Sequence, residues 1–403
     1  MAVATDTKIK STNDPNGTPQ MDFVKNNELI LNTGSLFVAG KITDNIGGFL
    51  QITNNRYDHI DNNSTKWRDK TYSDNTDIRY ADRFIDTNRD LIFGVSLNNN
   101  PSVSDVWSSA PAWGFNVVPG SNPYALPAAP LLNGGLAQQV VGVGTYVYWN
   151  KLIYAEVAAY QTADKFWSFM SQGYKHSDGS LSRLSGSAPY WRIALTKDWG
   201  AHNLMLGLMG LSAELHNDAT DPSTPTTHYR DIGFDSQYQY ILDPHTFSAQ
   251  VSYIHEQIHY DSSVAGQPGA YDLVMSGSTQ PLTNSSDRLN LFRVKGSYVY
   301  RATYGGTLSY FDLSSSYNSL IQAGIPGDPT QGGSLASFNN NTTGKYDTRG
   351  WTGEVFWIPE QHVRVGLQYT LFSKYLGASK NYDGWGRDAK DNNTLFFYVW
   401  GAY

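Results

Sequence analysis

Hydrophobic and polar residues alternate with a period of two along most of the chain. Between residues 287 and 301, one face carries Phe292, Val294 and Tyr298, and the other carries Arg293 and Lys295. Residues 228–242 and 361–375 alternate in the same way. Because successive side chains of a β-strand point to opposite faces, this pattern predicts strands with one apolar face and one polar face.

Short turns and long polar loops follow one another in regular order. Tight turns are predicted at Asp44-Asn45, Thr87-Asn88, Asn150-Lys151, Gly200-Ala201, Asp243-Pro244, Ala302-Thr303 and Pro359-Glu360. The segments between these hairpins are long and rich in Asn, Asp, Ser, Gly and Pro. A two-sheet sandwich would also have strands in which apolar and polar residues alternate, but that fold does not require short and long connections to alternate. The rhythm is typical of a transmembrane barrel with short periplasmic turns and long extracellular loops.

We therefore expect an all-β fold: one transmembrane antiparallel β-barrel domain over residues 1–403, with about 16 strands, located in a bacterial outer membrane. The first strand is predicted at residues 2–11 and the last at residues 393–403. An even number of strands would return both termini to the periplasmic side. The last segment places four residues on one face and resembles the C-terminal signal that the barrel assembly machinery reads: Leu395, Phe397, Val399 and Tyr403.

The composition agrees with a barrel. Aromatic residues make up 14% of the chain and charged residues only 16%, and the mean hydropathy of −0.43 argues against transmembrane helices. Tyr and Trp gather near the ends of the predicted strands, at Tyr148-Trp149, Tyr190-Trp191, Trp199, Tyr298-Tyr300 and Trp357. Aromatic girdles at the membrane interface would explain this distribution, and so would ordinary core aromatics. In the barrel interpretation, the first partner of the chain is outer-membrane lipid.

Charge and cysteine content exclude several classes of function. A net charge of −7 and the absence of any Lys/Arg run argue against a nucleic-acid partner. With no Cys, the chain itself can form no disulfide, thiolate metal site or covalent c-type haem link. The sequence opens MAVATDTKIKS, which lacks the long apolar core of a secretory signal. We therefore expect a mature or trimmed chain, or one that is not exported.

A barrel of about 16 strands encloses a lumen too wide for side chains alone to fill. We expect its lining to include the charged residues at inward positions, namely Glu156, Arg192, Asp231, Asp235, Arg293, Lys295, Glu354 and Arg364. They could produce a transverse field at a constriction or pair as structural ion networks. Residues 99–136 form the longest loop, which either folds inward to constrict the lumen or covers the extracellular mouth.

No enzymatic or metal site is predicted. His255 and His259 flank Glu256 in an H-E-x-x-H sequence, but the surrounding residues have strand character, which separates the two histidines by roughly 13 Å. Asp383, Asp388 and Asp391 offer oxygen ligands without the spacing of an EF-hand loop. No pairing of a nucleophile with a base can be argued from the sequence.

Four stretches carry a family resemblance: GSLFVAGKITDNIGGFLQIT, DNTDIRYADRF, DLIFGVSLNNNPSVSDVWSSAPAWGF and GGLAQQVVGVGTYVYWNKLIYAE. Between residues 34 and 156 the chain resembles the barrel portion of bacterial fused cytochrome–porin proteins. Members of that family carry a CxxCH haem-attachment motif ahead of the barrel. The resemblance implies a c-type haem on a segment preceding Met1, periplasmic electron carriers as partners, and electron transfer across the outer membrane. The chain has no Cys and departs from the family there.

Two functions stay open at this point. In the first, the barrel houses a haem segment and serves electron transfer. In the second, it is a haem-free porin for passive diffusion of ions or small solutes.

Overall fold

The computed structural model describes residues 3–4, 29–30, 33–60, 67–103, 126–172, 182–217, 219–223, 225–260, 285–317, 341, 343–382 and 386–402. Side chains are described for these residues except 3–4, 29–30, 56–60 and 67–68.

One antiparallel sheet of 15 strands makes up most of the described chain, and each strand pairs with its neighbour in sequence. The strands are β3 (Thr33–Lys41), β4 (Ile46–Ile60), β5 (Trp67–Ile85), β6 (Asp90–Asn98), β7 (Val140–Trp149), β8 (Ile153–Thr162), β9 (Ala188–Trp199), β10 (His202–His216), β11 (Thr226–Leu242), β12 (His245–Tyr260), β13 (Ser286–Tyr300), β14 (Tyr304–Ser315), β15 (Thr348–Glu360), β16 (Val363–Lys374) and β17 (Thr394–Gly401). The predicted all-β antiparallel fold is confirmed.

The sheet has one strand fewer than the count from the sequence suggests. Of the first predicted strand, only β1 (Val3–Ala4) is described, and it pairs with β2 (Leu29–Ile30) in a separate two-stranded sheet. Because neighbouring strands are antiparallel and their number is odd, the large sheet begins at one end of the barrel and ends at the other. Residues 5–11 lie outside the described part of the chain.

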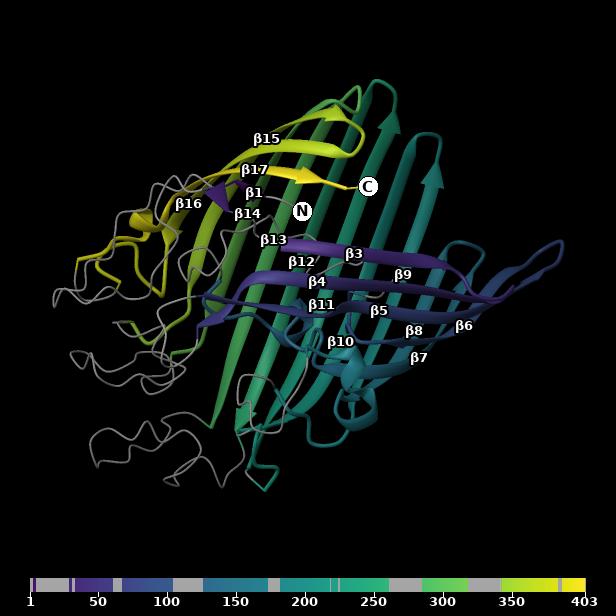
Figure 1. Cartoon of the computed structure of the whole chain (residues 1–403), viewed down its shortest axis with the longest axis horizontal. Coiled ribbons are helices and arrows are strands. Elements are labelled where there is room, and N and C mark those ends of the chain that lie inside the picture. The colour runs from purple at the N-terminus through teal and green to yellow at the C-terminus, as the bar shows by residue number, and fades with distance from the viewer. Residues whose placement is uncertain are drawn as a thin grey trace.

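Figure 1 shows that the sheet is rolled up, because β3, β4 and β5 cross in front of β10–β13 as a second wall. The two edge strands of the sheet are β3 and β17, and β1 lies beside β17. The sheet is thus a tilted-strand barrel with an inner and an outer face.

Short turns join the strands in pairs at one rim, which we call the short-turn rim, and longer connections lie at the other, the long-loop rim. Six predicted turns fall between the strands as expected. The seventh differs: Pro359 and Glu360 belong to β15, and Gln361 and His362 make the turn. The strand continues past Pro359 because the β15–β16 register shifts between Trp357 and Glu360, which accommodates the missing N–H.

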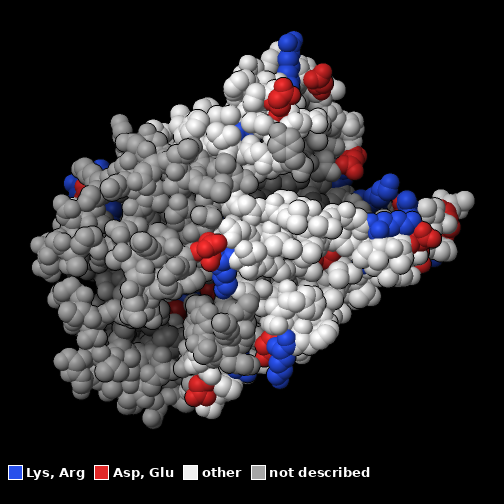
Figure 2. Space-filling model, viewed as in Figure 1, with Lys and Arg blue, Asp and Glu red and all other residues white. Residues whose placement is uncertain are grey.

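The outer face is apolar. Ile193, Leu208 and Val355 are 51%, 51% and 63% exposed, although large aliphatic side chains are normally buried in soluble domains. An outward aromatic row follows the short-turn rim, with Trp149, Trp199, Tyr298 and Trp357 all exposed. Tyr190 does not belong to this row, because it lies near the long-loop end of β9 and points inward, where it is 2% exposed. Figure 2 shows charged side chains at the projecting hairpin tips, with largely uncharged surface between them.

Three short 3-10 helices lie in the described connections: η3 (Leu131–Asn133), η4 (Lys165–Met170) and η6 (Ala389–Asn392). None of the helices in the described residues has the length and apolar character needed to cross a membrane. A buried apolar cluster lies inside the barrel, where Leu132 and Leu136 of the η3 region pack with inward residues of β7–β12, including Tyr160, Met209 and Ile254.

Candidate functional site

The inner face of the barrel carries the charged residues. On β9, Arg192 and Ala194 are buried, whereas Trp191, Ile193 and Leu195 are exposed on the outside. The same alternation places all eight charged residues singled out in the sequence on the inner side of their strands. They do not form one site, however. The pairing of the strands divides them into three groups along the wall.

The first group joins β8, β9 and β11. Arg192 donates from Nη2 to both carboxylate oxygens of Asp235, at 3.0 and 2.8 Å, and both side chains are 0% exposed. Glu156 stands opposite Arg192 in the β8–β9 register and accepts a hydrogen bond from the Tyr154 hydroxyl at 2.8 Å. Charge pairing inside the wall thus explains why these groups tolerate burial.

Gly207 makes the first group possible. It lies on β10, between Arg192 of β9 and Asp235 of β11, and is directly opposite Asp235. A Cβ at this position would overlap the carboxylate of Asp235 and the guanidinium of Arg192. The ion pair therefore passes over an intervening strand because that strand has no side chain there.

The second group is a pair of carboxylates that holds a loop segment. Asp231 of β11 and Glu256 of β12 are directly opposed, and they are 2% and 1% exposed. Glu256 accepts the backbone N–H of Leu131 at 2.7 Å, and Asp231 accepts that of Leu132 at 2.8 Å. These N–H groups begin η3 and have no partner within the helix, so carboxylates are well suited to receive them.

Residues 126–139 run along the inner wall. Leu126 and Ala128 pack on inward leucines of β13 and β14, and Leu136 belongs to the cluster that includes Val140 and Tyr160. The Ser102 hydroxyl ties the segment back to its own loop by donating to the Leu132 carbonyl at 2.8 Å. This described part of the 99–136 loop therefore lies inside the barrel, and residues 104–125 lie outside the described part of the chain.

The third group lies on β13, β15 and β16. Arg364 donates to Glu354 at 2.9 Å and lies over the ring of Phe356 at 3.7 Å. Gln368 also donates to Glu354, at 3.4 Å. Lys295 interacts electrostatically with Arg293, Glu354 and Arg364. This part of the wall carries three cations and one carboxylate among the predicted residues.

Opposite charges are thus separated around the barrel. Asp231, Asp235 and Glu256 lie on β11 and β12, where Asp235 is paired with Arg192 of β9, and the cationic group begins on β13. Glu256 was not among the residues predicted to line the lumen, although the structure places it on the inner face of β12. The period of two could have placed it, since it shares its face with Ile254, which is 0% exposed.

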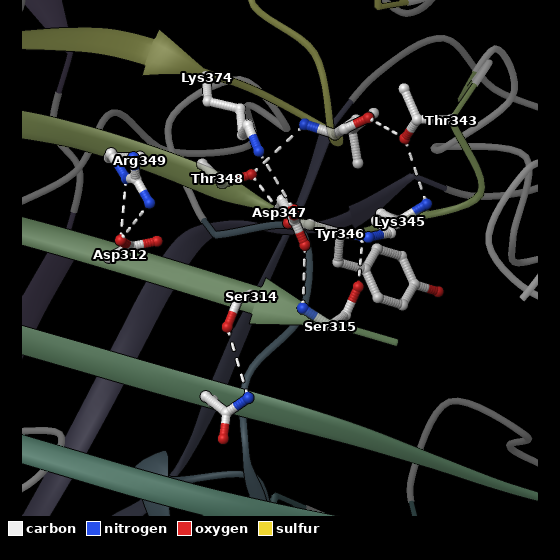
Figure 3. Close-up of polar contacts among 12 residues, drawn as sticks. Asp312, Ser314, Ser315, Thr343, Lys345, Tyr346, Asp347, Thr348, Arg349 and Lys374 are labelled. Carbon is white, nitrogen blue, oxygen red and sulfur yellow. Dashed lines mark hydrogen bonds and ion pairs between the residues drawn. The ribbon is translucent and has the colours of Figure 1, made fainter. Parts of the chain in front are cut away.

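The long-loop rim above β14–β16 is tied by a polar cluster (Figure 3). Asp347 accepts the Ser315 backbone N–H at 2.9 Å and receives Lys374 at 3.3 Å. Thr343 donates to the Leu376 carbonyl at 2.6 Å. Nearby, burial raises the pKa of Tyr375, so its hydroxyl stays neutral within the apolar cluster that it forms with Phe372 and Tyr382.

The other patterns of the sequence serve as structure. His255 and His259 point outward from β12 while Glu256 points inward, so the H-E-x-x-H residues do not converge. Asp388 and Asp391 form a capping box on η6, and Asp383 lies outside the described residues. In β17, Leu395, Phe397 and Val399 share the outer face, and Tyr403 is not among the described residues.

No protein-family model and no curated protein matches the chain. Among solved structures, it is similar to the outer membrane channel DcaP of Acinetobacter baumannii, with 14% identity, 100% of this chain and 92% of that one covered, and a TM-score of 0.46. Salmonella typhi OmpF in complex with daunomycin gives 10% identity, coverage of 99% and 95%, and a TM-score of 0.49. An anion-selective porin from Comamonas acidovorans gives 10% identity, covers 92% of this chain and 89% of that one, and has a TM-score of 0.45.

Proposed function

We propose that this protein is a porin-like diffusion channel of the bacterial outer membrane, in which residues 126–139 narrow a water-filled lumen. The observation that carries the proposal is the inward segment itself, which is anchored by two backbone N–H groups on the buried carboxylates Asp231 and Glu256. A segment held inside a wide barrel reduces its cross-section without requiring side chains to fill it. The apolar outer face supports the membrane location, with outer-membrane lipid and the barrel assembly machinery as partners.

The separation of charge along the wall gives this channel a preference among solutes. A solute passing residues 126–139 would meet the cationic group of Arg293, Lys295 and Arg364, because the carboxylates on β11–β12 are buried beneath that segment and against Arg192. Fixed charges in a low-dielectric passage raise the local concentration of counter-ions. The channel would therefore favour solutes that carry an anionic group.

Planar bilayer recording tests the function directly. The purified chain should give stepwise, ohmic conductance, and liposomes containing it should swell in small sugars but not in large ones. An absence of conductance from protein that migrates as a folded, heat-modifiable barrel would contradict the proposal.

An electron-transfer barrel is the second candidate, and the resemblance of residues 34–156 to cytochrome–porin barrels is what favours it. A c-type haem does not fit the residues present, because its attachment needs two thiols and the 403 residues contain no Cys. The haem would have to reside on polypeptide beyond these residues. A haem stain on the protein isolated from its native membrane separates the two candidates: a covalent haem band supports electron transfer, and conductance without haem supports the diffusion channel.

A further inference from the structure

A row of donor side chains crosses three neighbouring strands on the outside of the barrel. Arg230 of β11, Gln257 of β12 and Arg288 of β13 are directly paired in the strand register. All three are exposed and share the outer face with Ile232, which is 46% exposed. With strands about 4.8 Å apart, the two arginines stand roughly 10 Å from each other with the Gln257 amide between them.

A second row marks the opposite limit of the same surface. Tyr240, Phe247 and Tyr298 are paired across the same three strands, next to the short-turn rim. Exactly the same number of residues separates the two rows on each strand, because the register is unbroken. From Tyr240 to Arg230 is about ten residues, or about 33 Å along a strand, which is about 25 Å along the membrane normal at a tilt of about 40°.

That height is the height of the apolar band of an outer-membrane barrel, about 25 Å. The surface between the rows suits hydrocarbon, with Ile232, Phe234 and Tyr253 exposed on it. Polar outward groups on this surface have partners: His255 Nδ1 and Asn290 Oδ1 are 2.7 Å apart, and the Ser236 hydroxyl donates to the Met205 carbonyl at 3.0 Å. The arginine row therefore lies where hydrocarbon ends and lipid headgroups begin, on the side of the long loops.

The charges around the row leave it cationic. One register step farther out, the carboxylate of Glu214 is placed 3.5 Å from His228. Farther around the wall, the carboxylate of Asp312 is paired with Arg349 at 2.7 Å (Figure 3). The two guanidinium groups of the row outnumber the nearby Glu214 carboxylate, whose neighbour His228 counters its charge only when protonated. Guanidinium groups are suited to bidentate hydrogen bonds with phosphate oxygens.

We propose that Arg230, Gln257 and Arg288 form a binding site for the phosphate group of a phosphorylated glycolipid in the outer leaflet. The proposal rests on the membrane location given under the proposed function. Two guanidinium groups flank the phosphate, the Gln257 amide donates between them, and the acyl chains lie along Ile232 and Phe234. The occupant is a membrane lipid because the row coincides with the end of the apolar band.

The test uses the full chain in detergent, titrated with bis-phosphorylated lipid A and followed by native mass spectrometry. The R230Q/R288Q variant should lose at least tenfold in lipid A affinity. The control K197Q removes an outward cation near the short-turn rim and should bind as the unaltered chain does. Lipid A from which the phosphates have been removed should bind the unaltered chain as weakly as intact lipid A binds R230Q/R288Q.

Three outcomes would overturn the proposal: equal binding by R230Q/R288Q, equal binding of dephosphorylated lipid A, or full competition by inorganic phosphate at equal concentration. Conductance of R230Q/R288Q in planar bilayers reports separately on folding and on the channel, because neither arginine faces the lumen. Loss of lipid binding with retained conductance supports the site. If the unaltered chain shows no conductance, the channel proposal is contradicted. The lipid-binding measurements then test the lipid site independently of the channel.

Discussion

Asp231 and Glu256 face each other across β11 and β12, and each receives a backbone N–H from one of two consecutive residues, Leu132 and Leu131. Two carboxylates in such positions repel each other, and the donors of η3 offset that repulsion. The pair therefore fixes the depth and position of residues 126–139 inside the barrel.

Removing both carboxylates should release this segment. We expect D231A/E256A to show a different mean conductance and more frequent current transitions than the unaltered chain, because it removes the two hydrogen bonds that hold Leu131 and Leu132, and a typical hydrogen bond contributes about 0.5–1.5 kcal/mol. Single-channel recording measures this. D312A, which removes an outward carboxylate, is the control and should behave as the unaltered chain. Identical current traces from D231A/E256A would show that the carboxylates do not hold the segment.

The Arg192–Asp235 ion pair should show the energetics of a buried pair. We expect R192M or D235L alone to lower the free energy of unfolding by about 3–5 kcal/mol, because each leaves one buried charge without its partner. The double variant should recover most of that loss, since neither charge remains. Urea unfolding followed by tryptophan fluorescence measures all three variants. Additive losses in the double variant would contradict a direct interaction.

Gly207 gives an independent check of the same pair. We expect G207A to destabilise the barrel, because the added methyl group overlaps both charged side chains. G296A, at a strand glycine where an added Cβ meets nothing within 4 Å, is the matched control. Equal unfolding midpoints for the two variants would argue against close passage of the ion pair over β10.

The cationic group on β13 and β16 should set ion preference. We expect R293Q/K295Q to lower the anion-to-cation permeability ratio by up to roughly tenfold at low ionic strength. The effect should shrink in about 1 M salt, where the Debye length is about 3 Å. Reversal potentials in a salt gradient measure the ratio. K41Q, at the exposed end of β3, should leave the ratio unchanged, and a similar shift in both variants would exclude a local effect of the lumen wall.

Gly377 should be hard to replace. Its φ is +89°, and an added Cβ would overlap the side chain of Thr343, which holds the rim by its bond to Leu376. We expect G377A to cost about 1–3 kcal/mol and to make the β16–β17 connection more sensitive to proteolysis. G386A, also at positive φ but with open space around it, keeps the backbone strain without the overlap. Equal protease sensitivity in the two variants would show that backbone strain, and not the overlap with Thr343, causes the effect of G377A.

Local sequence patterns were enough to predict most of the strands, six of the seven short turns and the inward position of residues such as Arg192 and Asp235. These features depend on local properties: side chains alternate along any strand, and turn residues act within a few positions. The seventh turn lies two residues later than predicted, because a register shift extends β15 beyond Pro359. No local pattern of residues reveals that shift.

Which inward residues contact one another depends on the strand register and on how the sheet rolls up. Arg192 reaches Asp235 because Gly207 lies between them, and Glu256 joins Asp231 because the β11–β12 register places them opposite each other. Residues 126–139 lie inside the barrel because two of their N–H groups donate to carboxylates there and their leucines pack on an apolar wall. Each of these contacts joins residues far apart in the chain, and the free energy that selects them comes from packing and hydrogen bonds that exist only once the sheet has rolled up.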